Sequence, residues 1–156
     1  MVGTSNTIAL AEFIIGPVDN KLGRAVAYTA TMQNNPLACR ATLINGLYNT
    51  ATVAQGRAPG QRWQDGRAGY CGINTILPPN SASCTSQTSS GIHSASSKHT
   101  GGVQAGLADG SVHFISANID TGNLSLPPVT SGISPCGVWG ALGSKDGGEP
   151  TASVSQ

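Results

Sequence analysis

The sequence contains few charged residues and no run of basic ones. Asp, Glu, Lys and Arg make up only 10% of its 156 residues, and the formal net charge is +1. The eight basic residues are scattered along the chain. Nucleic-acid-binding proteins usually present a basic patch or stripe to the phosphate backbone. The composition therefore argues against a nucleic-acid partner.

Long apolar runs are also lacking. No stretch approaches the roughly 20 apolar residues that a membrane-spanning helix needs. The longest apolar cluster near the start, residues 8–15, is short, contains Glu12 and follows no basic segment, so it does not fit a signal peptide. We therefore expect a soluble chain with no membrane span. The abrupt start at Met1 suggests a piece of a longer protein.

Aromatic residues are scarce, since the chain has 2 Trp, 3 Tyr and 2 Phe, whereas it has 21 Gly and 9 Pro. This composition is typical of a turn-rich, mainly β protein with a small core. The length fits one domain. We expect that domain over residues 1–150, followed by a flexible Ser/Thr-rich tail over residues 151–156.

The four cysteines, Cys39, Cys71, Cys84 and Cys136, include no C-x-x-C pair, which argues against a zinc knuckle or a thioredoxin-like redox motif. An even number of cysteines in a small, loop-rich chain predicts two disulfides formed in an oxidising compartment. Buried free thiols in a cytosolic protein are the alternative interpretation. Three pairings are possible, and the spacing does not select one of them.

Two elements are expected in the first third of the chain. Residues 7–15 are predicted to form a strand. Residues 37–48 place apolar side chains on one helical face directly after Pro36, which suits the first turn of a helix. Asn34 or Asn35 is available as the N-cap of that helix.

The middle and the end of the chain give weaker patterns. Trp63 and Tyr70 are expected to pack over the core from a segment rich in Gly and Pro. Residues 81–97 are dense in serine and predict an exposed, irregular loop. Trp139 and Leu142 suggest a last short helix or turn that packs back on the core.

Residues 102–108 and 111–115 predict a β-hairpin around an Asp109-Gly110 turn. A two-residue loop would place Leu107 opposite Val112. Because strand side chains alternate between the two faces, the core face is expected to hold Val103, Ala105, Leu107, Val112 and Phe114. His113 would then lie on the outer face, opposite Gly106.

The spacing from His99 to Asp109-Gly110 fits an H-x9-DG signature, and other blocks follow the same order along the chain. These blocks are Gly3-Thr4-Ser5-Asn6-Thr7 with Glu12, Arg62-Trp63-Gln64-Asp65-Gly66, Asn74-Thr75-Ile76-Leu77-Pro78-Pro79-Asn80-Ser81 and the segment from Trp139 to Glu149. Together they resemble a large planctomycete-type family of prepilin-like surface proteins. The resemblance covers nearly the whole chain.

Members of that family resemble type II secretion pseudopilins and type IV pilins, with a cleaved leader, a hydrophobic N-terminal helix and a β-rich head outside the cytoplasmic membrane. We expect the leader and the long helix to be absent here, so the resemblance implies the head alone. It implies an α+β fold of mainly antiparallel strands, with one or two short helices and disulfides that staple the loops.

The resemblance also implies a role and a location. The role would be structural or one of interaction, with other pseudopilin-like or surface proteins as partners. The location would be extracellular, on the cell surface or periplasmic, which agrees with the even number of cysteines. Within the motif, Asp109 and Gly110 suit a turn, because Asp accepts local N–H bonds and Gly adopts positive φ.

All three histidines of the chain, His93, His99 and His113, fall between positions 93 and 113. Imidazole is a common ligand of copper and zinc, and three histidines with an open position are typical of catalytic metal sites. The alternative function is therefore a small copper-dependent enzyme, with zinc as the second choice of metal, for example a superoxide dismutase-type oxidoreductase. The spacings match no standard metal motif, so exposed or hydrogen-bonded histidines remain the other interpretation.

Overall fold

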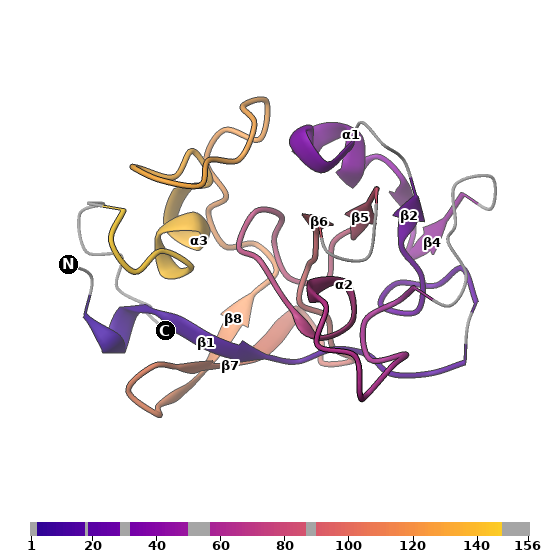
Figure 1. Cartoon of the computed structure of the whole chain (residues 1–156), viewed down its shortest axis with the longest axis horizontal. Helices are drawn as coiled ribbons and strands as arrows, with labels where there is room; N and C mark the ends of the chain where they lie inside the picture. Colours follow the sequence, from indigo (N-terminus) through magenta and orange to yellow (C-terminus); the bar gives the residue numbers. More distant parts are fainter. Residues whose placement is uncertain (1–2, 18, 29–31, 50–56, 87–89, 148–156) are drawn as a thin grey trace.

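A computed structural model describes residues 3–17, 19–28, 32–49, 57–86 and 90–147 and shows the expected α+β class (Figure 1). The helices are Thr4–Asn6 (η1), Met32–Asn34 (η2), Pro36–Arg40 (α1), Ala68–Cys71 (α2) and Gly137–Leu142 (α3). The strands are Ile8–Ala11 (β1), Ala27–Tyr28 (β2), Leu43–Ile44 (β3), Leu47–Tyr48 (β4), Cys84–Thr85 (β5), Gly91–Ile92 (β6), Gly102–Leu107 (β7) and Val112–Ser116 (β8). The predicted tail, residues 151–156, lies outside the described residues.

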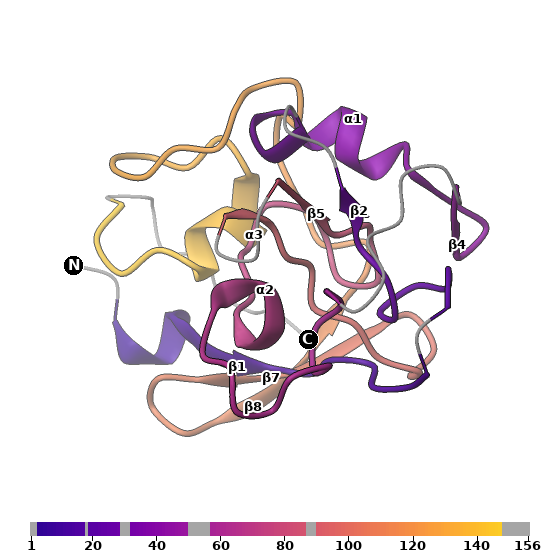
Figure 2. The same ribbon diagram turned by 45° about the vertical axis from the view of Figure 1, so that its right-hand side comes forward.

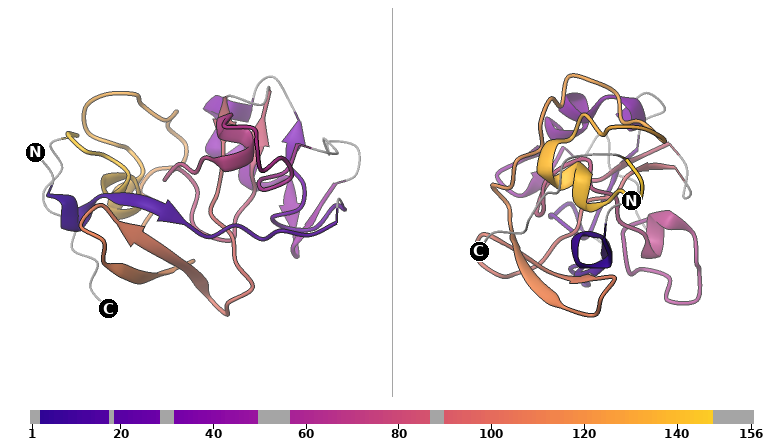
Figure 3. Two further views of the ribbon diagram at one scale, coloured as in Figure 1. Left: turned by 60° about the horizontal axis from the view of Figure 1, so that its bottom comes forward. Right: turned by 90° about the vertical axis from the view of Figure 1, so that its left-hand side faces the viewer.

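The longest strands form one antiparallel sheet in the order β1-β7-β8. A second, smaller sheet has the order β2-β5-β6 and contains a parallel pair, while β3 and β4 form a separate hairpin. In Figure 1 the main sheet lies at the bottom with α3 above it, and α1 lies with the smaller strands toward the right. Figures 2 and 3 show the same arrangement from other directions.

Buried side chains form two clusters. One lies around the smaller sheet and contains Ala25, Ala27, Cys39, Tyr48, Leu77, Ala82, Cys84, Ile92 and Leu124. The other joins the inner face of the main sheet to α3 and contains Ala95, Val103, Ala105, Ile115, Trp139 and Leu142. The indole Nε1 of Trp139 donates a hydrogen bond to the carbonyl of Leu77 (2.8 Å), which links the two clusters. The short last helix that packs back on the core is thus confirmed.

The start of the predicted helix is confirmed, but its length is wrong. Asn35 is the N-cap, its side chain accepts a backbone hydrogen bond of 3.0 Å, and Pro36 opens the helix. The helix ends at Arg40 instead of continuing to residue 48. Asn45 and Gly46 follow with φ of 51° and 76°, the left-handed pair that a two-residue hairpin turn requires. The second half of the segment is therefore the β3–β4 hairpin.

The predicted β7–β8 hairpin forms around a loop of three residues rather than two. The amide of Leu107 donates to the carbonyl of Ser111 (2.8 Å), so residues 108–110 make up the loop. Gly110 has φ of 89°, as loops of this length require at their last position. The extra residue shifts the pairing of the two strands by one position.

This shift exchanges the two faces of β8. Ala105 pairs with His113 instead of Phe114, and Ile115 instead of Phe114 is the buried apolar residue of β8. Val112 and Phe114 are 67% and 47% exposed, so the prediction that they face the core is wrong. His113 lies on the same side of the sheet as Ala105, not on the outer face.

Three smaller predictions also need correction. The first strand ends at Ala11, because Phe13 and the residues after it leave the sheet as extended chain. Trp63 is 92% exposed and does not pack over the core, whereas Tyr70 is buried. The described part of residues 81–97, that is 81–86 and 90–97, is not an exposed loop. It contains β5 and β6 and is mostly buried, and Ser94 Oγ donates to the carbonyl of Ala82 (2.8 Å).

Candidate functional site

Two residues of the sequence motifs, Glu12 and His99, meet at the end of β1. Nε2 of His99 lies 3.2 Å from Oε1 of Glu12, and Oε2 of Glu12 accepts the amide of Gln104 at 2.7 Å. The side chains of His99 and Glu12 are 56% and 35% exposed. This pair therefore ties the end of β1 to the segment that leads into β7, and it stays accessible to solvent.

A shallow cavity of about 290 Å³ lies beside the pair, lined by residues 12–15 and 96–99. Ser97 is the hydroxyl next to His99 in sequence, but it donates to the carbonyl of Gly102 (2.6 Å) and accepts from the amide of His99 (3.0 Å). The His99 ring points to Glu12 instead of to this hydroxyl. The contact with Glu12 joins two segments of the fold, and the arrangement does not place an imidazole against a serine nucleophile.

Asp109 and Gly110 occupy the hairpin loop. Oδ1 of Asp109 accepts the amide of Ser111 at 2.9 Å and its hydroxyl at 2.7 Å. These hydrogen bonds lower the pKa of the Asp109 carboxyl, since they favour its charged form. One oxygen of the Asp109 carboxylate, Oδ1, is thus engaged within the turn.

His93 is buried in the interior, with 3% of its surface exposed. Its backbone is bonded to Asn74, but neither ring nitrogen has a hydrogen-bond partner among the described residues. Burial lowers the pKa of His93 to about 4, because the imidazolium form would lose its hydration. His93 is therefore neutral at neutral pH.

His113 lies half-buried on the inner side of the main sheet. Its Nε2 is 3.1 Å from the hydroxyl of Ser111, and its Nδ1 has no hydrogen-bond partner in the described ranges. Across the part of the chain that the structure describes, no group of three or more His, Cys, Asp or Glu is placed to hold a metal ion. The three histidines thus occupy three different environments: His99 lies in an exposed contact with Glu12, His93 in the interior and His113 on a sheet face.

The four cysteines form one disulfide, not the two expected. Cys39 of α1 and Cys84 of β5 are bonded, which staples the helix to the smaller sheet. Cys71 is a free, exposed thiol and Cys136 a free, buried one. Burial raises the pKa of Cys136, so its thiol stays protonated near neutral pH.

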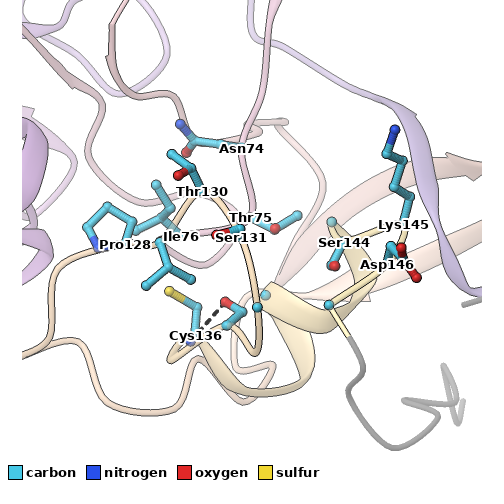
Figure 4. A pocket seen from close by; sticks show the side chains of 16 residues that line it. Asn74, Thr75, Ile76, Pro128, Thr130, Ser131, Cys136, Ser144, Lys145 and Asp146 are labelled. Atoms are coloured by element: carbon cyan, nitrogen blue, oxygen red, sulfur yellow. Dashed lines mark hydrogen bonds between the residues drawn. The ribbon is translucent and has the colours of Figure 1, made fainter. Parts of the chain in front are cut away.

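A cavity of about 510 Å³ lies beside α3, and no sequence pattern indicated it. Three segments line it: residues 74–76, residues 128–136 and the end of α3 with the chain to residue 147. Figure 4 shows Asn74, Thr75 and Thr130 gathered on one side and Lys145 on the other. The Ser- and Thr-rich composition of residues 128–136 was the only available signal, and on its own it indicates a loop.

Comparison with known proteins identifies a family to which the chain is similar. The family model described as "Protein of unknown function (DUF1559)" matches residues 2–122. No curated protein and no solved structure matches the chain. Of the helices that the described ranges contain, none has the length and hydrophobicity needed to cross a bilayer.

Proposed function

Because the chain belongs to the DUF1559 family, a planctomycete-type family of prepilin-like proteins, we propose that it is an extracytoplasmic head domain with a structural or interaction role. The Cys39–Cys84 disulfide supports an oxidising compartment, since such bonds are rare in the cytosol. Within that role, we propose that the outer strand of the main sheet is the contact surface.

The observation that carries the proposal is the unpaired edge of β8. Among the described residues, β8 has β7 as its strand neighbour on one side and no strand on the other. The amide of Leu107 bonds to the carbonyl of Ser111, and that of Ala117 to the carbonyl of Gly101. Hydrogen bonding alternates along an antiparallel pair, so the N–H and C=O groups of Val112, Phe114 and Ser116 point away from β7.

The side chains beside this edge are apolar and exposed. Leu10 of β1 is 72% exposed, and Val112 and Phe114 of β8 are 67% and 47% exposed. Leu10 and Val112 both pair with Gly106. Because Gly106 has no side chain, the outer face of the sheet has a depression between Leu10 and Val112. Exposed edges with apolar neighbours are usually blunted in soluble monomers. An edge left open in this way favours strand addition from a partner.

The occupant that best fits the edge is a second copy of the chain. The backbone N–H and C=O groups that point away from β7 belong to Val112, Phe114 and Ser116. Those of Val112 and Ser116 lie at equal distances along the strand on either side of those of Phe114. Two β8 strands can therefore pair antiparallel, with Phe114 opposite Phe114 of the other copy and Val112 opposite Ser116. Such an interface is self-complementary, as two-fold symmetry requires. It would join two three-stranded sheets into one and agrees with a pseudopilin-like head that assembles with its own kind.

Light scattering coupled to size exclusion, run over a range of protein concentrations, tests this surface. We expect a monomer–dimer equilibrium that Phe114→Lys abolishes, because the substitution places a charge at the centre of the interface. Ile44→Lys is the matched control, since Ile44 is also an exposed apolar residue (67%) but lies on the β3–β4 hairpin. A chain that stays monomeric at every concentration, or two variants that dimerise equally, would overturn the proposal.

The copper or zinc enzyme has less support, because the three histidines are spread over three environments. A shared metal site would require His93 to leave the interior and approach the exposed His99. Elemental analysis of protein purified without chelators tests whether the protein binds copper or zinc. Stoichiometric copper or zinc that is lost in a triple His→Ala variant would establish the metal site and make the interaction role secondary.

A further inference from the structure

The cavity beside α3 has walls that are held in place by close packing. Gly140 and Gly143 lie on the side of α3 that faces the other two segments, and a Cβ on either would clash with Ser134 or Thr75 respectively. The two loops can approach the helix only because both positions are glycine. The wall at residues 74–76 is fixed further, because Asn74 Nδ2 donates to the carbonyl of Gly91 (2.8 Å). The cavity is therefore a formed feature of the fold, of about 510 Å³, within the usual range of small-molecule sites.

Neutral polar side chains line this cavity from all three segments. They are Asn74, Thr75, Thr130, Ser131, Ser134 and Ser144. Hydroxyl and carboxamide groups both donate and accept hydrogen bonds. Ile76 and Val129 add a smaller apolar area to the lining.

The charges at the cavity do not favour an ion. Lys145 and Asp146 are neighbours of opposite sign at one end, so the lining carries no net charge. The glycine-rich segment 143–148 lacks the Lys-Ser or Lys-Thr that ends a phosphate-binding loop. An apolar ligand would cover the hydroxyls of Thr130 and Ser131 without offering them a hydrogen bond, which costs free energy.

The geometry points to a binding site for a neutral, polyhydroxylated small molecule, a monosaccharide or a single sugar unit of a longer chain. Each sugar hydroxyl both donates and accepts, as the hydroxyls of Thr130, Ser131 and Ser144 in the lining do. The carbon-bound face of a pyranose ring would lie against Ile76 and Val129. The raised pKa of the Cys136 thiol keeps this nucleophile of the lining protonated near neutral pH. The site is therefore proposed for binding alone. It is separate from the β8 edge and does not depend on dimerisation.

Amide chemical shifts of ¹⁵N-labelled protein, recorded during titration with sugars, test this site. D-glucose, D-galactose, D-mannose and N-acetyl-D-glucosamine serve as neutral probes, and inorganic phosphate serves as the anionic one. We expect saturable shifts with at least one sugar, confined to residues 74–76, 128–136 and 140–147. Phosphate should give none.

The variants Thr130→Val and Ser131→Ala test whether the sugar binds in this cavity. Both residues are exposed loop positions in the lining, so both variants should keep the native fold and spectrum. Each lost hydroxyl should weaken binding about fivefold, the effect of one neutral hydrogen bond. Thr100→Val, an exposed threonine outside the cavity, is the matched control and should bind as the parent does. The proposal is overturned by the absence of saturable shifts with all four sugars, by saturable phosphate binding at these residues, or by sugar affinities that both cavity variants leave unchanged.

Discussion

Glu12 and His99 lie side by side although 87 positions separate them in the sequence, with 3.2 Å between Oε1 and Nε2. The second oxygen of the same carboxylate accepts the amide of Gln104. One side chain thus connects the end of β1 both to β7 and to the segment before it. The two blocks that carry the family resemblance at these positions serve the same structural purpose, which is to hold the main sheet together.

Glu12→Ala should destabilise the protein by about 1–2 kcal/mol, because it removes a hydrogen bond to a charged acceptor in a half-exposed position. His99→Ala should cost less than about 1 kcal/mol, since the His99 side chain is more exposed and only its contact with Glu12 is lost. Urea unfolding of both variants at neutral pH measures the difference. Equal losses would show that the bond to the Gln104 amide contributes nothing of its own.

The cysteines should show one disulfide and two thiols of different reactivity. Reduction should raise the intact mass by two hydrogens, and the bond closes a loop with a sequence separation of 45. In the chain-entropy description such a loop contributes about 4 kcal/mol. A maleimide should label Cys71 in the native protein and Cys136 only after unfolding, because Cys136 is buried and its pKa is raised. A mass gain of four hydrogens would contradict this assignment.

The β7–β8 hairpin shows how far sequence pattern can determine local structure. The Asp-Gly turn and the inward face of β7 were predicted correctly, since Val103, Ala105 and Leu107 are buried. The length of the loop was predicted incorrectly, because an Asp-Gly pair fits both a two-residue and a three-residue loop. Strand side chains alternate with a period of two. The one-residue difference in loop length therefore put each β8 side chain on the face opposite to the predicted one.

Other errors came from reading polar composition as exposure. Residues 81–97 looked like a loop because of their serines, yet the disulfide at Cys84 and the hydroxyl-to-backbone bonds let this segment enter the core. The Asn45-Gly46 turn was visible in the sequence, but the helical spacing around it obscured the hairpin. The cavity beside α3 depends on contacts between distant segments, so no local pattern could predict it.

Trp139→Phe should lower stability by about 2–3 kcal/mol, from lost packing and from the Leu77 carbonyl that loses its donor. Trp63→Phe is the matched control, because Trp63 is 92% exposed, and it should change stability by less than about 0.5 kcal/mol. Urea unfolding followed by circular dichroism compares the two variants. The fluorescence of the Trp139→Phe variant should be red-shifted and readily quenched by acrylamide, since only the exposed indole remains. Similar losses of stability in the two variants would contradict the position of Trp139 between the two buried clusters.

His93 should make the protein less stable as the pH falls below neutrality. Burial lowers its pKa from 6.5 to about 4, so the unfolded chain binds a proton between these values that the folded chain does not. Stability is therefore fully present above about pH 6.5 and decreases as the pH falls toward about 4. Between about pH 7.5 and about pH 5 the expected loss is about 2 kcal/mol. Asp19, Asp65 and Asp109 add little in this window, because their pKa values are lowered from 3.8.

The variant His93→Leu isolates this contribution. The imidazole nitrogens have no partner among the described residues, so an apolar side chain of similar size should cost little at neutral pH and remove most of the pH dependence. Trp63→Leu is the control, since Trp63 is 92% exposed and carries no titratable group, and it should keep the parent's slope. The free energy of unfolding in urea, measured at several pH values, gives the three slopes. If His93→Leu loses stability between neutral and mildly acidic pH as steeply as the parent, His93 is not the group that takes up the proton on unfolding.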